Sequence, residues 1–248
     1  NCTYAGVPVT SSNVSVLVDP DSKGTVTVES DATEAVVSSG TMDSFDVAMN
    51  SGLDIKLAAD VKGASAKSNG YGKTGVNHSN YKTIDGGGNK ITITGANATW
   101  DSNLATKGGI IKNVEIDGGF RGIFVTNGTQ KVILENVVVK KSVYTISCDQ
   151  AGKQGLEATG CTFDGWTSFA ATLGDAKFVD CSFGEGSGYK FMRPYAPTVL
   201  ENCTFCEGYQ IDPRATTTLK NCKVGGVLVT DANKKELLGS ENLVISNN

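Results

Sequence analysis

The chain has 248 residues, with 30 glycines, 5 prolines and a formal net charge of −4. Its many glycines, together with abundant Val, Thr, Ser and Asn, favour an all-β protein with tight corners over a helical one. The mild charge offers no basic surface for nucleic acid, and no apolar run approaches the ~18 residues that cross a bilayer. We therefore expect a soluble chain without membrane insertion.

Seven cysteines and a single histidine, His78, limit the metal chemistry that the chain can perform. A single C-x-x-C pair occurs, Cys203 and Cys206, with no second pair and only one histidine to complete a ligand set, so the sequence predicts no zinc site and no other metal or cofactor. His78 lies in the loop sequence GVNHSNY and is expected to be an ordinary surface residue rather than a general base.

Residues 1–40 are predicted to form an N-terminal β arm. The stretches VSVLV (14–18) and GTVTVE (24–29) alternate like two strands, and the turn sequence DPDSKG joins them. Such an arm either attaches the protein to a larger body or folds along the next domain as a small β extension.

The segment 41–52 predicts a short helix. Thr41 or Ser44 can cap its N-terminus and Gly52 can end it, while apolar side chains recur at helical spacing at Phe45, Ala48 and Met49. Because the open end of a sheet exposes unpaired strand edges, we expect this helix to cap one end of the main domain, residues 41–248. A strand is expected directly after it, over 53–57.

One short motif then recurs about every 22 residues, at separations of 23, 24, 20, 22 and 19. Its copies are NVEI (113–116), NVVV (136–139), GCTF (160–163), DCSF (180–183), NCTF (202–205) and NCKV (221–224). The sequence TIDGGGNKITITG (83–95) is an earlier copy. A repeat of this length predicts a solenoid, in which each turn buries its apolar face against its neighbours.

Alternation along the strands separates inward from outward positions. The first inward column is Val114, Val137, Cys161, Cys181, Cys203 and Cys222, and the second is Ile116, Val139, Phe163, Phe183, Phe205 and Val224. Like residues would stack at ~4.8 Å between turns. The stacked cysteines are expected to be buried reduced thiols, and a disulfide between adjacent turns is the alternative.

Each motif copy opens with Asn, Asp or Gly, which are residues that tolerate a left-handed backbone at a corner. An Asn side chain there can also hydrogen-bond its neighbour in the next turn.

A second strand follows in each turn. Its inward column is predicted to be Ile123, Ile146, Phe169, Phe191 and Ile211, and the outward column beside it Phe124, Ser147, Ala170, Met192 and Asp212.

This pattern resembles the parallel β-helix proteins of the pectin-lyase-like superfamily, over about residues 53–229. The resemblance implies an all-β fold, a right-handed single-stranded parallel β-helix with short capping helices at both ends. Members include polysaccharide lyases and hydrolases, phage tailspikes and fibres, and bacterial surface proteins. The second cap is predicted over 230–239, followed by a last strand over 242–246.

One polar cluster is a candidate ligand site, because adjacent turns would bring its members together. It contains Lys190, Arg193, Asp212 and Arg214, with Tyr144, Tyr189, Tyr195 and Tyr209 nearby. It would contact an anion or a glycan, since aromatic faces bind sugars and cations. The alternative is a solvated, salt-bridged corner with tyrosines packed beneath it. No pair of carboxylates shares an outward column, so no catalytic residue is assigned.

Segments such as GFRGIFV, VYTISCDQ and GYKFMRPYAP resemble β-helix proteins of phage virions and bacterial surfaces. The resemblance implies a non-enzymatic structural protein, such as a phage fibre, tailspike-like or capsid-decorating subunit for display or adhesion. Expected partners are virion or cell-surface proteins and glycans, at an extracellular or virion surface, and the analogy suggests a homotrimer. The alternatives are an extracellular polysaccharide lyase or glycoside hydrolase, for which Lys190, Arg193 and Asp212 would be tested, and a bacterial cell-surface adhesin.

Overall fold

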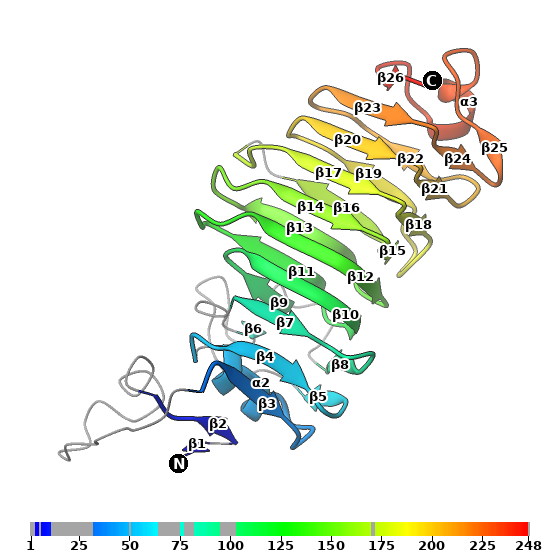
Figure 1. The fold of residues 1–248 in the computed structure, drawn as a ribbon. Coiled ribbons are helices and arrows are strands. Elements are labelled where there is room, and N and C mark those ends of the chain that lie inside the picture. The colour runs from blue at the N-terminus through cyan, green and yellow to red at the C-terminus, as the bar shows by residue number, and fades with distance from the viewer. Residues whose placement is uncertain are drawn as a thin grey trace.

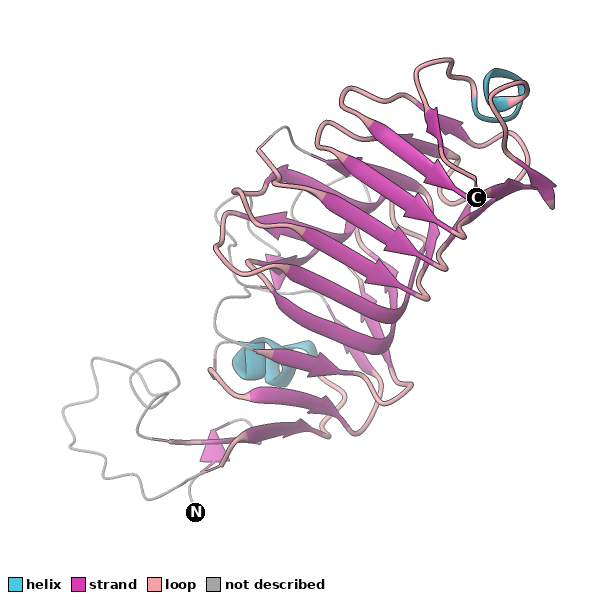
Figure 2. Ribbon diagram, turned by 45° about the horizontal axis from the view of Figure 1, so that its top comes forward, coloured by secondary structure: helices cyan, strands magenta, loops and turns pink. Residues whose placement is uncertain are grey.

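The chain forms a parallel β-solenoid of about 8 turns in the computed structural model (Figure 1). The structure describes residues 3–4, 6–10, 32–49, 51–63, 75–76, 82–94, 103–169 and 172–247. Two short helices occur in this part of the chain, one near each end of the stack, as Figure 2 shows. The predicted all-β parallel solenoid is therefore confirmed. Neither helix has the length and apolar character needed to cross a membrane.

The best-formed turns each contain three strands. Two of these strands meet at a corner in a larger sheet, and the third belongs to a seven-stranded sheet on another side of the coil. These turns are β14 (Leu156–Thr159), β15 (Thr162–Asp164) and β16 (Trp166–Phe169); β17 (Ala176–Val179), β18 (Ser182–Gly184) and β19 (Phe191–Arg193); and β20 (Thr198–Glu201), β21 (Thr204–Phe205) and β22 (Gln210–Ile211).

In the two preceding turns the corner strands are continuous. These turns are β10 (Gly109–Gly118) with β11 (Arg121–Thr126), and β12 (Val132–Lys140) with β13 (Tyr144–Gln150). Upstream lie β3 (Glu34–Val37), β4 (Asp54–Leu57), β5 (Val61–Gly63), β6 (Gly75–Val76), β7 (Thr83–Asp85), β8 (Lys90–Ile93) and β9 (Asn103–Thr106). The short strands β1 (Thr3–Tyr4) and β2 (Val7–Pro8) pair with each other.

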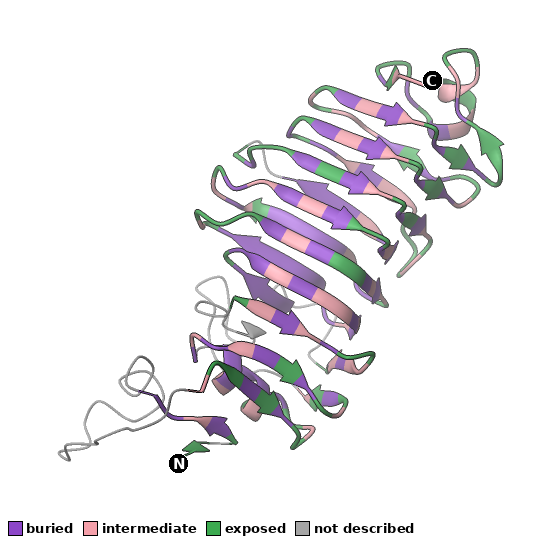
Figure 3. Ribbon diagram, in the orientation of Figure 1, coloured by how far each residue is buried: buried purple, intermediate pink, exposed green. Residues whose placement is uncertain are grey.

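The predicted inward columns of the larger sheet are confirmed. Phe163 pairs with Phe183, and Phe183 pairs with Phe205, in parallel register, and all three side chains are buried. The rings of Phe183 and Phe205 stack at 5.1 Å between centroids. Figure 3 shows buried positions alternating with more exposed ones along these strands.

The corners take the predicted left-handed conformation. The φ angles are 52° to 53° at Asn113, Asn136, Asp180, Asn202 and Asn221. Asn136 Nδ2 donates to Asn113 Oδ1 at 3.2 Å, which joins two successive turns as expected. Asn113 Nδ2 donates in turn to Asp85 Oδ1 at 3.1 Å.

The N-terminal helix, α2 (Met42–Met49), forms where it was predicted. The Ser44 N–H donates to Thr41 Oγ1 at 3.4 Å, which identifies Thr41 as the cap. Phe45, Ala48 and Met49 are buried in the core. The preceding strand β3 pairs in parallel with β4, so the stacked sheet extends upstream of residue 41. The strands predicted over 14–18 and 24–29, and His78, lie outside the described residues.

The C-terminal cap is shorter than predicted. Helix α3 covers Lys234–Leu238 and ends at Gly239. The segment 230–233 forms a turn instead, because Asn233 Oδ1 accepts the Thr230 N–H at 2.7 Å and Asn233 Nδ2 donates to the Leu228 carbonyl at 3.0 Å. Two short strands, β24 (Lys223–Val224) and β25 (Val227–Leu228), precede this helix in the chain. After the helix, strand β26 (Val244–Ile245) pairs in parallel with β23 (Thr217–Lys220).

The predicted register of the seven-stranded sheet is wrong in two turns. Thr167 pairs with Ile146, and Met192 pairs with Ile211, so Thr167 and Met192 occupy the inward column. Phe169 instead pairs with Cys148, and Phe191 pairs with Trp166. Met192, expected to point outward, is fully buried. Ala170 lies outside the described residues, and Ser168 and Arg193 pair in line with Ser147. Phe124 and Ser147, also expected to point outward, are fully buried, so that prediction is wrong for both.

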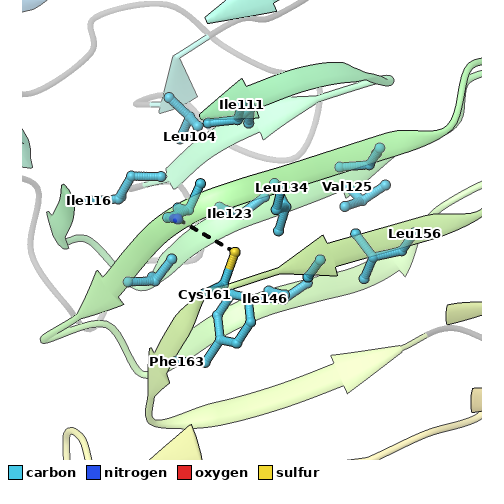
Figure 4. Close-up of a cluster of buried hydrophobic side chains, with 14 of the residues drawn as sticks. Leu104, Ile111, Ile116, Ile123, Val125, Leu134, Ile146, Leu156, Cys161 and Phe163 are labelled. Carbon is cyan, nitrogen blue, oxygen red and sulfur yellow. Dashed lines mark hydrogen bonds between the residues drawn. The ribbon is translucent and has the colours of Figure 1, made fainter. Parts of the chain in front are cut away.

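The four stacked cysteines are free and buried. Each thiol donates to the carbonyl two residues before it, and the thiols of Cys181, Cys203 and Cys222 also reach a carbonyl of the previous turn. Figure 4 shows Cys161 among apolar side chains, where its sulfur accepts the Val137 N–H at 3.4 Å. The expected reduced thiols are confirmed over the disulfide alternative.

Truncation of a stacked phenylalanine should be costly. We expect Phe183→Ala to lower the free energy of unfolding by about 3–5 kcal/mol, because a cavity replaces the contacts of its ring with four aromatic rings. These rings belong to Phe163, Phe178, Phe205 and Tyr209. Urea denaturation measures the loss. The adjacent outward variant Ser182→Ala serves as a control and should stay within about 0.5 kcal/mol of the parent. Equal losses in the two variants would show that the inward column is misassigned.

Thiol reactivity should separate buried from accessible cysteines. Cys148 and the four stacked thiols are buried, so a reagent in solution does not reach them. Burial also raises the pKa of Cys148, which keeps that thiol protonated. In a Cys2→Ser background we expect Ellman's reagent to modify the partly exposed Cys206 in the native protein and all six described cysteines after denaturation. Rapid labelling of any of the four stacked cysteines in the native protein would contradict the fold.

Candidate functional site

The structure brings three of the predicted site residues into direct contact. Arg193 ends β19, and Asp212 directly follows β22 on the next turn. Arg193 Nε lies 3.0 Å from Asp212 Oδ2, and Arg214 Nη2 lies 2.7 Å from the same oxygen. One carboxylate therefore bridges two guanidinium groups at the partly exposed surface.

Lys190 lies on the same side of the solenoid but has other partners. Its Nζ is 2.9 Å from Glu185 Oε2 and 3.4 Å from the carbonyl of Glu207. The hydrogen bond with Glu185 raises the pKa of Lys190, so the ammonium group is charged at neutral pH.

Two of the predicted tyrosines, Tyr189 and Tyr209, differ in their exposure to solvent. Tyr189 is 38% exposed and borders the charged cluster. Tyr209 is fully buried, with ring centroids 5.2 Å from Phe205 and 6.0 Å from Phe183. Tyr209 is therefore a core residue and does not present a surface for a ligand.

Neighbouring aromatic side chains continue the site along the seven-stranded sheet. Ring centroids lie 5.5 Å apart for Phe120 and Tyr144, 4.8 Å for Tyr144 and Trp166, and 5.3 Å for Trp166 and Tyr189. The sequence analysis did not assign Trp166 to the site, and it placed Phe191 in the core. The sequence signal that could have found them is an aromatic residue a few positions after each motif copy, at Tyr144, Trp166 and Phe191, which pair with one another in the structure.

Arg193 connects the aromatic side chains with the charged cluster. Its guanidinium carbon lies 5.0 Å from the ring centroid of Phe191 and 5.8 Å from that of Trp166. The Trp166 and Phe191 rings meet edge to face, with centroids 5.1 Å apart. Cation–π contacts of this kind hold the guanidinium in place without using its hydrogen-bond donors.

These side chains line a surface hollow of about 440 Å³, which we call the aromatic hollow. Its lining includes Trp166, Tyr189, Lys190, Phe191, Arg193 and Gln210. Gly188 and Gly208 complete it, and a Cβ built on Gly188 would meet no other atom within 4 Å. The volume falls in the range of small-molecule sites, and the mixture of rings with a few polar groups is typical of them.

The arrangement suits binding better than acid–base chemistry. The lining of the aromatic hollow contains no carboxylate, and the adjacent Asp212 is already paired with two arginines. Across the part of the chain that the structure describes, no group of three or more His, Cys, Asp and Glu side chains is placed to hold a metal ion.

Comparisons with known proteins found no match: no family model, no curated protein and no solved structure is similar to this chain. The parallel β-solenoid therefore rests on the geometry described above. Membership of the pectin-lyase-like superfamily stays a prediction from the sequence.

Proposed function

We propose that this protein is a non-enzymatic structural component of a phage virion, which uses its solenoid to display a glycan-binding site for adhesion. The aromatic hollow is the observation that carries the proposal. The virion setting rests on the sequence resemblance, as do the expected extracellular location and the partnership with other virion proteins.

The hollow offers both kinds of contact that a sugar needs. The half-buried ring of Trp166 and the more exposed ring of Tyr189 provide apolar surface for the C–H face of a pyranose. Lys190, Arg193 and Gln210 provide donors, and Gln210 also provides an acceptor, for hydroxyl groups around the ring. An apolar floor with a few polar groups at its edge fixes the orientation of a ligand.

The solenoid is suited to holding this site at a fixed position. Trp166, Phe191 and Gln210 come from three successive strands that pair in parallel, so the lining moves with the packed core. Sites on strands are held more accurately than sites on loops, which favours recognition without a conformational change.

The enzymatic alternative receives less support. Glycoside hydrolysis generally uses two carboxyl groups about 5–9.5 Å apart, one of which must be able to give up a proton. Asp212 already binds Arg193 and Arg214, and the lining of the aromatic hollow offers no second carboxyl group to act with it. A bacterial surface adhesin would share the glycan contact and differ in the assembly that carries it.

Removing an aromatic side chain from the hollow should weaken glycan binding. We expect Tyr189→Ala and Trp166→Ala each to reduce affinity for a responsive oligosaccharide by about tenfold or more, or ~1.4 kcal/mol, because a stacking surface is lost. Screening of immobilised glycans followed by calorimetry measures the effect. Tyr195→Ala is the matched control, since Tyr195 is 41% exposed and lies outside the hollow lining.

Three results would overturn the proposal. The first is the absence of binding to any glycan in a broad panel, and the second is equal affinity in Tyr189→Ala, Trp166→Ala and the parent. The third is release of reducing or unsaturated sugar from the panel, which would favour the enzyme. Presence of the chain in purified virions, and its absence from the surface of the host bacterium, separates the virion component from the adhesin.

A further inference from the structure

We propose that the site selects neutral sugars over acidic ones; this inference rests on the proposed glycan-binding function. It depends on how the charges at the hollow are arranged. Two cations line it, and each has a carboxylate oxygen within 3.0 Å: Lys190 with Glu185, and Arg193 with Asp212. A third cation, Arg214, binds the same oxygen of Asp212 from outside the lining.

Asp212 lies where an acidic ligand would have to bind. A uronate carboxylate that approached Arg193 and Arg214 would meet the negative charge of Asp212 between them. Two like charges at contact distance repel, and they repel more strongly near a protein surface than in bulk water. Displacing Asp212 would break its two ion pairs, so we expect the two arginines to bind a second anion weakly.

The same pairs are well suited to hydroxyl groups. A hydroxyl can donate to a carboxylate and accept from a guanidinium, so vicinal hydroxyls can bond to Asp212 and Arg193 together without breaking their contact. Arg193 retains donors for this purpose, because its Nε makes the 3.0 Å bond to Asp212 while its guanidinium plane lies near Phe191 and Trp166.

A second hollow continues the pattern of paired charges. It has a volume of about 490 Å³ and shares Phe191 and Gln210 with the aromatic hollow. Its lining adds Asp212, together with Lys235 and Glu241, whose Nζ and Oε1 atoms form a further ion pair at 2.5 Å. A ligand of more than one sugar ring would therefore meet paired charges along its length.

The test compares two probes of equal length, a neutral gluco-oligosaccharide series and an oligogalacturonate series, by calorimetry at low and high salt. The parent should bind a neutral oligosaccharide at least about tenfold more tightly than any uronate, with an affinity that salt hardly changes. Asp212→Asn removes the negative charge between the arginines at nearly constant volume. It should raise uronate affinity by about tenfold or more, and that gain should shrink as salt increases.

Glu157→Gln is the control for net charge, because Glu157 pairs with Lys131 in the larger sheet, away from both hollow linings. It should leave both affinities unchanged. Tighter binding of a uronate by the parent, or no gain of uronate affinity in Asp212→Asn, would overturn this inference and leave the glycan-binding function intact. Failure of the parent to bind either probe series or any other glycan would remove the proposed function, and this inference with it.

Discussion

In-register stacking of like side chains along the solenoid axis is the constraint on which the rest of the structure depends. Each strand of the larger sheet pairs with the equivalent strand one turn away, so Phe183 must pack between Phe163 and Phe205. The size and shape of a side chain in one turn therefore limit which side chain can pack on it in the next turn. The free thiols of the cysteine column are buried directly after the corner in four successive turns.

The same constraint determines where a binding site can form. The corner residues of the larger sheet keep one conformation, with Asn136, Asp180 and Asn202 all near φ 53°. The corner that leads to the seven-stranded sheet varies instead: Trp166 follows Phe163 by three residues, whereas its partner Phe191 follows Phe183 by eight. The longer corner carries Tyr189 and Lys190 to the surface beside Trp166, and this local irregularity produces the aromatic hollow.

The sequence predicted the larger sheet well because its spacing is fixed by packing. The corner residue, the Cys column and the Phe column keep the same offsets in every copy, so alternation identified each inward position. The seven-stranded sheet could not be aligned in the same way, because a solvent-facing corner can change length without disturbing the core. For this reason the sequence analysis assigned Phe191 instead of Met192 to the inward column. It also left Trp166 out of the candidate site and included the buried Tyr209 in it. The contact of Arg193 and Arg214 with Asp212 was accessible from sequence, since both adjoin prolines at neighbouring turns.

Anomalous scattering from sulfur in crystals of this protein would test the stacking most directly, because it locates the thiols without reference to the rest of the chain. The account predicts that the sulfurs of Cys161, Cys181, Cys203 and Cys222 form a single row inside the coil, with neighbours separated by about one strand spacing of 4.8 Å. Sulfur positions that are scattered through the molecule, or a row interrupted between Cys181 and Cys203, would contradict it.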